Sequence, residues 1–293
     1  NRLTLLEILT MGPLTFAFNE RTYGLMKQMN VSAKWITLLK EHLDSFEITL
    51  GQEQLDGVLN EIFPDSTKHT ATRKAIVEAS AIAAYQGLPH ALSIILTDNA
   101  PQFQVITKLL ALCWIHEGRH YKKLMPCFLW HQMQVNAFLK KFWKFYHALL
   151  EYKQAPNGRK AKTLSKRFDV LFSEKTGYDA LDKRISMTKS RKESLLLVLQ
   201  YPELPLHNNA SELGARAQAR KRDTSLHTMS HKGTEAKDTV MTIVETAKKL
   251  GVNVYHYLYD RITQKYELPS LADLIKRASS PDQSKNLALP QIT

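Results

Sequence analysis

The chain has 293 residues, of which 44% are hydrophobic and 9% aromatic, a composition that is ordinary for a globular protein and excludes general disorder. Its formal net charge of +12 favours a polyanionic partner, most commonly nucleic acid, although ribosomal, membrane-surface and lysine-rich globular proteins share such a charge. No stretch approaches the roughly 18 consecutive apolar residues that span a bilayer. Two cysteines are too few for a disulfide framework and indicate a reducing cytosol. The chain starts at Asn1 without a signal-peptide pattern, so we expect a fragment or a processed product.

The N-terminal part is predicted to be mainly helical, because its apolar residues recur at helical spacing. A short strand is expected at Thr15–Phe18. The expected helices cover Leu3–Leu9, about Glu20 to Asp44, about Gln52–Ile62 and Thr72–Tyr85.

Two short apolar runs then predict an α/β core. Ala91–Leu96 is too short for a helix and is flanked by turn residues, so we expect a fully buried strand that stops at Asp98. A short helical segment, about Gln102–Leu109, leads to a second candidate buried strand, Leu110–Ile115. A strand, a crossover helix and a strand make a parallel pair.

The chain from His131 to about Leu199 is predicted to be an inserted helical domain, with a solvated turn at Pro156–Lys162. An apolar stripe at helical spacing is expected in its core: Phe138, Phe142, Phe145, Tyr146, Leu149 and Leu150.

The last part of the chain is again predicted to be helical. Helices are expected around Asn209–Lys221, Glu235–Leu250 and Val254–Thr263, with Gly251 at a helix C-terminus. The polar end, Ser279–Thr293, is expected to be a flexible tail.

Two carboxylates are candidates for a metal site. Asp98 would follow a buried strand, at the sheet edge where ligands gather, although Asp-Asn-Ala-Pro also makes a simple turn. Glu212 would lie in the first turn of a helix, where it also completes a capping box with Asn209 as the N-cap. The two interpretations of Glu212 are compatible, because another rotamer of the side chain can reach a metal.

Basic residues near both carboxylates are candidate DNA contacts. His116 and Arg119 follow the second predicted strand, and a further basic group follows Glu212. Such a group would hold a phosphate backbone, or it is a solvated basic face. Its members are Arg216, Arg220, Lys221 and Arg222.

A zinc site is a further candidate. The possible ligands are Cys113, His116, His120 and Cys127, but these residues lack the paired spacing of structural zinc modules. The sequence also has no Gly-rich phosphate loop and no Gly-x-Ser-x-Gly motif, which argues against nucleotide-dependent enzymes and serine hydrolases.

Four blocks together resemble the DDE transposases of the insertion-sequence sixty-six family, and more closely its ISNCY-like relatives. The resemblance covers essentially the whole chain, in the same order and spacing. The blocks are LTDNAPQF around Asp98, ALCWIHEGRHYKKL (Ala111–Leu124), LHNNASELGARAQARKRD (Leu206–Asp223) and TAKKLGVNVYHYLYDRI (Thr246–Ile262).

The resemblance implies a mostly helical α/β fold: a ribonuclease-H-like core with a helical insertion domain and three carboxylates that hold two Mg²⁺ (or Mn²⁺) ions. The family's second acidic residue falls on Asp98 and its third on Glu212. The family's Cys-Trp-x-His block falls on Cys113, Trp114 and His116, and its Arg-Lys pair falls on Arg220 and Lys221.

The implied domains are residues 1–130 as the first part of the core, 131–205 as the insertion, 206–278 as the rest of the core and 279–293 as the tail. One departure from the family is plain. The family's first aspartate lies in an Asp-Asp-Thr block, and Asp44, Asp56 and Asp65 match no such motif. The first three strands of the core and one metal ligand are therefore expected to be missing, and the chain as given is expected to be inactive.

For the full-length parent, the resemblance implies metal-dependent DNA strand cleavage and strand transfer by an insertion sequence. The alternative is a non-catalytic DNA-binding remnant of such a transposase. The implied partners are transposon ends, target DNA and a second copy of the chain, with no membrane. The implied location is the bacterial cytoplasm, at the nucleoid.

Overall fold

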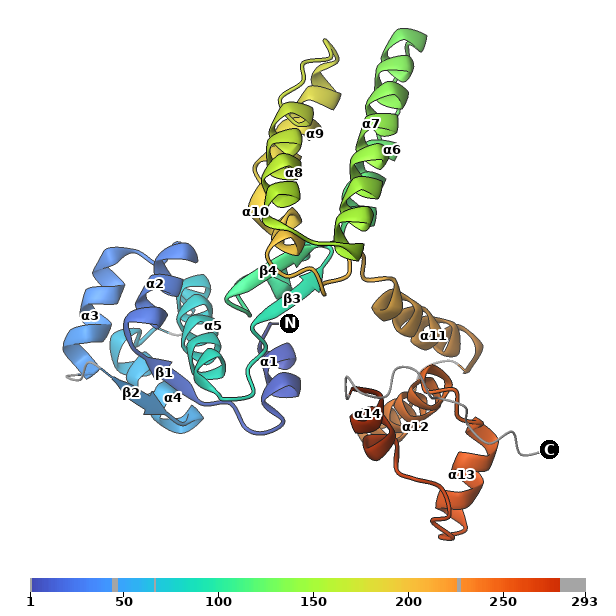
Figure 1. The fold of residues 1–293 in the computed structure, drawn as a ribbon. Helices are drawn as coiled ribbons and strands as arrows, with labels where there is room; N and C mark the ends of the chain where they lie inside the picture. Colours follow the sequence, from blue (N-terminus) through green and yellow to red (C-terminus); the bar gives the residue numbers. More distant parts are fainter. Residues whose placement is uncertain (1, 44–46, 66, 226–227, 280–293) are drawn as a thin grey trace. The chain divides into compact units, whose positions relative to one another are not determined.

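The computed structural model describes residues 2–43, 47–65, 67–225 and 228–279, which form two compact units (Figure 1). The first unit ends at Asn208 and the second begins at Asn209. The predicted tail lies outside the described residues except for Ser279, which ends a helix. The described chain is mostly helical, as predicted.

The first unit begins with a helical lobe around a small antiparallel sheet. In this sheet, β1 (Phe16–Phe18) pairs with β2 (Ile48–Leu50), with Phe16 opposite Leu50. The lobe's helices are α1 (Arg2–Thr10), α2 (Glu20–Gln28), α3 (Ala33–Leu43), α4 (Gln52–Ile62) and α5 (Thr70–Gly87).

Most of the predicted elements of this lobe are confirmed, and two details differ. The helix predicted from Glu20 onward is two helices, because Asn30 adopts a left-handed φ of 62° between them. Strand β2 was not predicted. Helix α5 packs against α1, α2 and β1, and its buried residues include the small Ala79 and Ala83, which let neighbouring backbones approach closely.

The predicted parallel strand pair is confirmed. Strand β3 (Ile94–Thr97) pairs with β4 (Leu109–Leu112), with Thr97 opposite Leu112. The prediction of a crossover helix between these strands is wrong. The connection is a 3₁₀ turn, η1 (Pro101–Phe103), followed by turns that include Val105 at a φ of 63°. A proline and a left-handed residue cannot continue an α-helix.

Two further predictions for these strands are wrong. Ile94–Leu96 are half-buried rather than fully buried. The second strand ends at Leu112, and Trp114 and Ile115 belong to the next helix, α6 (Trp114–Lys122). Each described sheet has two strands, so the ribonuclease-H-like core stays a prediction.

The predicted helical insert packs around aromatic side chains (Figure 1). Trp114 is fully buried, and its ring lies 5.5 Å from that of Phe142 between centroids. The predicted stripe is buried except for Leu150, which is half-buried. The predicted turn is shorter than expected, because Asn157 caps the next helix by accepting a hydrogen bond from Lys160 N at 2.8 Å. The elements are α7 (Leu129–Gln154), α8 (Gly158–Leu171), α9 (Asp179–Lys189), α10 (Lys192–Leu195) and η2 (Leu197–Leu199).

The second unit contains four helices in its described residues, one of which was not predicted. These are α11 (Asn209–Ser225), α12 (His231–Lys249), α13 (Val254–Ile262) and the unpredicted α14 (Leu271–Ser279). The role of Gly251 is confirmed: it has a φ of 69°, and Val252 N donates to Ala247 O at 2.9 Å, the pattern of a Schellman motif.

Candidate active site and DNA-contacting residues

Asp98 follows β3 directly and is exposed at the carboxyl end of the parallel pair. Its Oδ1 accepts hydrogen bonds from Thr97 Oγ1 at 3.1 Å and from Ala100 N at 3.2 Å. The second bond closes a local turn, so the turn and the exposed position at the sheet edge occur together. Asn99 has a left-handed φ of 71°, which turns the chain sharply away after the strand.

The first turn of α6 lies at the same sheet edge as Asp98. Cys113 N donates to Thr97 O at 2.9 Å, so the residue before α6 is bonded to the residue before Asp98. His116 and Arg119 follow on this helix, and Arg119 Nη1 lies 3.1 Å from His116 Nε2. The structure therefore brings the start of α6 next to Asp98 through the strand register.

The same edge also holds the end of the first unit. Trp114 N donates to Leu206 O at 2.9 Å, and the indole Nε1 of Trp114 donates to Leu195 O at 2.9 Å. The first residue of α6 thus bonds to both the end of the insert and the segment before Asn208.

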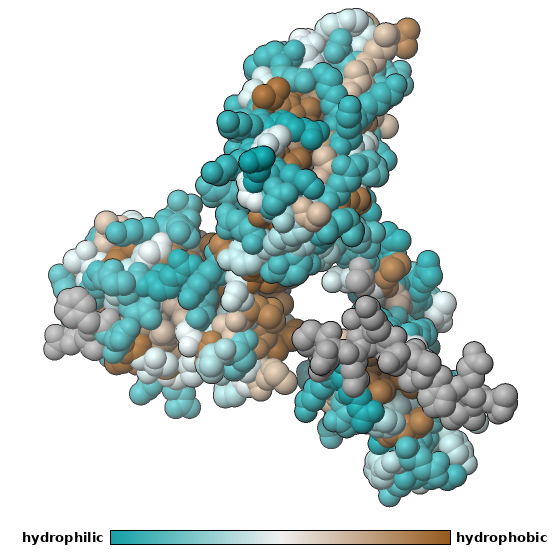
Figure 2. Space-filling view, viewed as in Figure 1, coloured by the Kyte–Doolittle hydropathy of each residue, from teal (hydrophilic) through white to brown (hydrophobic). Residues whose placement is uncertain are grey.

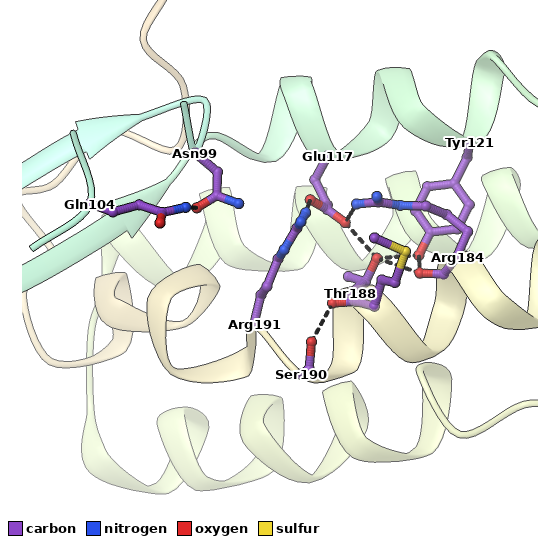
Figure 3. A network of polar contacts seen from close by, with 9 residues as sticks. Asn99, Gln104, Glu117, Tyr121, Arg184, Thr188, Ser190 and Arg191 are labelled. Atoms are coloured by element: carbon purple, nitrogen blue, oxygen red, sulfur yellow. Dashed lines mark hydrogen bonds and ion pairs between the residues drawn. The ribbon is translucent and has the colours of Figure 1, made fainter. Parts of the chain in front are cut away.

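A second carboxylate in this region is buried. Glu117 is 4% exposed on the inner side of α6, where Arg184 of α9 pairs with its Oε1 (Figure 3). Thr188 Oγ1 donates to the same oxygen at 2.5 Å, and Arg191 Nη1 donates to Oε2 at 3.1 Å. Both carboxylate oxygens are therefore satisfied, and they join α6 to α9 and to the residue just before α10.

Tyr121 extends this network. Its hydroxyl lies 2.5 Å from Thr188 Oγ1, and its ring is fully buried. Burial raises the pKa of Tyr121 well above its usual value, against the opposing effect of its hydrogen bond with Thr188. Tyr121 is therefore a neutral hydroxyl, and the network carries its charge on Glu117 and the two arginines.

Glu212 lies in the first turn of α11, in the second unit. Its side chain is 19% exposed, and Arg216 Nη2 lies 3.7 Å from Glu212 Oε2. The helix begins at Asn209 itself, whereas the sequence predicted Asn209 as the residue before the helix. Asp98 belongs to the first unit and Glu212 to the second.

The predicted basic residues of α11 lie on its surface. Arg216 has a side chain that is 60% exposed, and Arg220, Lys221 and Arg222 are exposed. The helix extends four residues beyond its predicted end at Lys221, so all four basic residues are helical.

Comparison with known proteins identifies the family. The family model described as "Transposase IS66 family" matches residues 69–236, which include Asp98, the whole insert and Glu212. The chain belongs to the IS66 transposase family. A curated protein of Sinorhizobium fredii, named "Uncharacterized protein y4jO", is 42% identical over 170 residues, which are 58% of this chain and 52% of that protein. The chain thus spans about half the length of this relative. No solved structure matches.

Two further observations bear on this IS66 family member. Cys113 is buried and Cys127 is exposed, and no three His, Cys, Asp or Glu side chains in the described part of the chain gather as a metal-ion cluster. None of the described helices is long and apolar enough to cross a membrane. Hydrophilic residues cover most of the coloured surface that Figure 2 shows.

Sequence reasoning missed Glu117 as a structural residue of this family member. A signal for it was present, because Trp114, Glu117, Gly118 and Tyr121 follow helical spacing and all four are buried. A glutamate on an apolar helical stripe needs buried partners. The sequence alone could not identify those partners, since Arg184 is 67 residues away.

Proposed function

We propose that the full-length parent of this chain carries out metal-dependent DNA strand cleavage and strand transfer, with Asp98 and Glu212 as two of the carboxylates at the reacting phosphate. The observation that carries the proposal is Asp98: an exposed carboxylate at the carboxyl edge of a parallel strand pair, within the matched transposase region. Ligands of open α/β sheets bind at this edge.

The carboxylate chemistry fits Mg²⁺ or Mn²⁺ as the implied cofactor. Both of Asp98's hydrogen bonds to described residues end on Oδ1, which leaves Oδ2 for a hard cation. Glu212 would supply a second oxygen ligand. A bound pair of ions would stabilise the attacking and leaving oxygens of the phosphodiester. The described carboxylates do not form a complete ligand set, so we assign no step beyond ligand binding to either residue.

The proposed DNA contacts are cationic or polar side chains around these carboxylates. In the first unit they are His116 and Arg119 on α6. In the second unit they are exposed residues of α11, of which Arg216 and Arg220 share one face: Arg216, Arg220, Lys221 and Arg222. Contacts of this kind position the phosphate backbone and carry no sequence information.

A basic groove in the first unit supports a polyanionic partner. It runs between the N-terminal lobe and the insert, and its lining includes Arg21, Lys108, Lys162 and Lys192, with Glu193 as the acidic side chain. Lys192 also pairs with Asp169 at 2.7 Å, and Arg21 Nε donates to Gln86 Oε1 at 2.8 Å.

We assign the proposed roles to the domains that the sequence predicts. Residues 1–130 and 206–278 would carry the catalytic carboxylates. The insert, 131–205, would support α6 through the bonds of Trp114 and Glu117. We propose that the protein acts on transposon ends and target DNA as a homodimer, at the bacterial nucleoid.

Asp98→Asn and Glu212→Gln, made in the full-length parent, test the proposal in a strand-transfer assay with the ends of the protein's own element and Mg²⁺ or Mn²⁺. We expect each to lower the rate by at least about a hundredfold, because even outer-shell changes at metal sites cost about 10–100-fold. Asp56→Asn is the matched control, since Asp56 is exposed on α4.

Two results would contradict the catalytic proposal. Unchanged strand transfer by Asp98→Asn would remove Asp98 from the site. A wild-type protein that binds DNA in a salt-dependent manner but joins no ends would support the alternative, a DNA-binding protein without chemistry.

A further inference from the structure

Helix α13 presents an exposed aromatic face in the second unit. Tyr255, Tyr259 and Ile262 are spaced by four and three residues, so they share one side of the helix. They are 72%, 50% and 78% exposed, respectively. We call these three residues the tyrosine face.

The two tyrosine rings of this face are nearly parallel. Their planes differ by 16° and their centroids lie 6.3 Å apart. Flat, exposed aromatic rings offer π-faces on which another planar ring can stack. The tyrosine face therefore suits a planar aromatic ligand better than an irregular one.

Other aromatic residues of this region have structural roles, which sets the tyrosine face apart. Tyr257 is buried, and its hydroxyl accepts a hydrogen bond from Leu271 N at 3.3 Å. The Arg261 guanidinium lies 4.9 Å from the ring centre of Tyr257 and 5.3 Å from that of Tyr266. Tyr257 thus contacts Arg261 and bonds to α14, and Tyr266 contacts Arg261, whereas Tyr255 is 72% exposed.

The charge around the tyrosine face favours an anion. Lys265 Nζ lies 5.6 Å from the ring centre of Tyr259. The acidic residue of α13, Asp260, is buried and accepts a hydrogen bond from Glu267 N at 2.8 Å, so the described helix exposes no carboxylate. Glu267 is exposed in the loop beyond Lys265.

We propose that the tyrosine face binds unpaired bases of single-stranded DNA, with Lys265 against the phosphate backbone. Proteins that bind single strands combine aromatic stacking platforms with cations in this way. A duplex hides the faces of its bases, so it cannot use the two tyrosines. The inference rests on the proposed function in that DNA is the ligand, and it adds a preference for unpaired strands at residues other than the carboxylates.

Fluorescence anisotropy of the full chain with a labelled single strand, and with the matching duplex, tests the proposal. We expect Tyr255→Ala/Tyr259→Ala to weaken single-strand binding by about tenfold or more and to leave duplex binding unchanged. A 2-aminopurine base in the strand should be quenched by the wild type and not by this variant, because quenching reports stacking.

Matched variants separate stacking from hydrophobic contact. Tyr255→Phe/Tyr259→Phe should bind as the wild type, because the rings remain. Tyr255→Leu/Tyr259→Leu should bind as poorly as the alanine variant. Phe128→Ala/Trp130→Ala is the control for removing exposed aromatics elsewhere, since these residues, at the start of α7, are 69% and 51% exposed. Far-UV circular dichroism checks that each variant folds.

Lys265→Gln gives an independent readout. Loss of one phosphate contact should reduce the slope of log K against log salt by about 0.7 for a single strand. The same substitution should not change the slope for the duplex.

The outcomes separate this inference from the proposed function. Wild-type protein that binds duplex as tightly as single strand, with no tyrosine dependence, overturns the inference alone. Wild-type protein that binds neither overturns both. Leucine variants that bind single strands as the wild type does would overturn stacking and indicate hydrophobic contact with the strand instead.

Discussion

The sheet edge at β3 and the interface between α6 and α9 each hold a carboxylate, in opposite surroundings. Asp98 is exposed and receives two local hydrogen bonds on one oxygen. Glu117 is 4% exposed and receives Arg184, Thr188 and Arg191 on its two oxygens. A carboxylate saturated by buried partners has a structural role, whereas an exposed one remains available to a cation or to DNA.

The largest predicted effect comes from removing the charge of the buried carboxylate, Glu117. Glu117→Gln leaves Arg184 and Arg191 without their buried counter-charge, so we expect the free energy of unfolding to fall by about 3–5 kcal/mol. Denaturant unfolding of the full chain measures this loss. Glu174→Gln is the control, because Glu174 pairs with an exposed Lys141 and should cost about 0–1 kcal/mol. Equal small losses in both variants would contradict a structural role for Glu117.

The next effect tests how closely α6 must approach α7 for the Glu117 network to form. A Cβ on Gly118 would lie 2.7 Å from the Trp143 ring and 3.1 Å from that of Phe142. We therefore expect Gly118→Ala to destabilise by about 1–3 kcal/mol. Gly57→Ala on α4 is the matched control: nothing lies within 4 Å of its Cβ, and alanine should stabilise that helix by up to about 1 kcal/mol. A Gly118→Ala protein as stable as the wild type would mean that the two helices can separate freely.

Sequence patterns predicted the helices well where the signal is local. The predicted bounds of α4, Gln52–Ile62, are those observed, and the aromatic stripe of α7 is buried as expected. Both rest on the periodicity of neighbouring residues, which a helix imposes within a few turns.

Predictions failed where long-range contacts or turn chemistry decide the outcome. The expected helix between β3 and β4 is a 3₁₀ turn that begins at Pro101. The second strand was extended into Trp114, because a buried aromatic residue fits a strand as well as a helix start. The partners of Glu117 come from α9 and beyond, and no local pattern marks them. Asp98 was predicted at the end of a strand and is observed there, but the roles of Asp98 and Glu212 stay predictions.

A smaller effect is expected when the charge of the exposed carboxylate, Asp98, is removed. Asp98→Asn keeps an oxygen that can accept from Thr97 and Ala100, and the site is exposed. We expect its free energy of unfolding to stay within about 0.5 kcal/mol of the wild type, even as strand transfer is lost. The same denaturant series as for Glu117→Gln measures it. A loss as large as that of Glu117→Gln would show that Asp98, too, has a structural role.

The smallest effect is a pH dependence that reports the charge around Glu117. Burial lowers the pKa of His120, and Arg184, Arg191 and Lys123 lower it further, against the opposing charge of Glu117. Because the folded pKa lies below the unfolded value of about 6.5, the unfolded chain binds a proton first, and stability falls as the pH drops below about 6.5. His120→Gln should remove this contribution to the pH dependence of the free energy of unfolding. As the pH is lowered, the variant should therefore lose less stability than the wild type does. A difference between the two proteins that does not change with pH would contradict a lowered pKa of His120 in the folded protein.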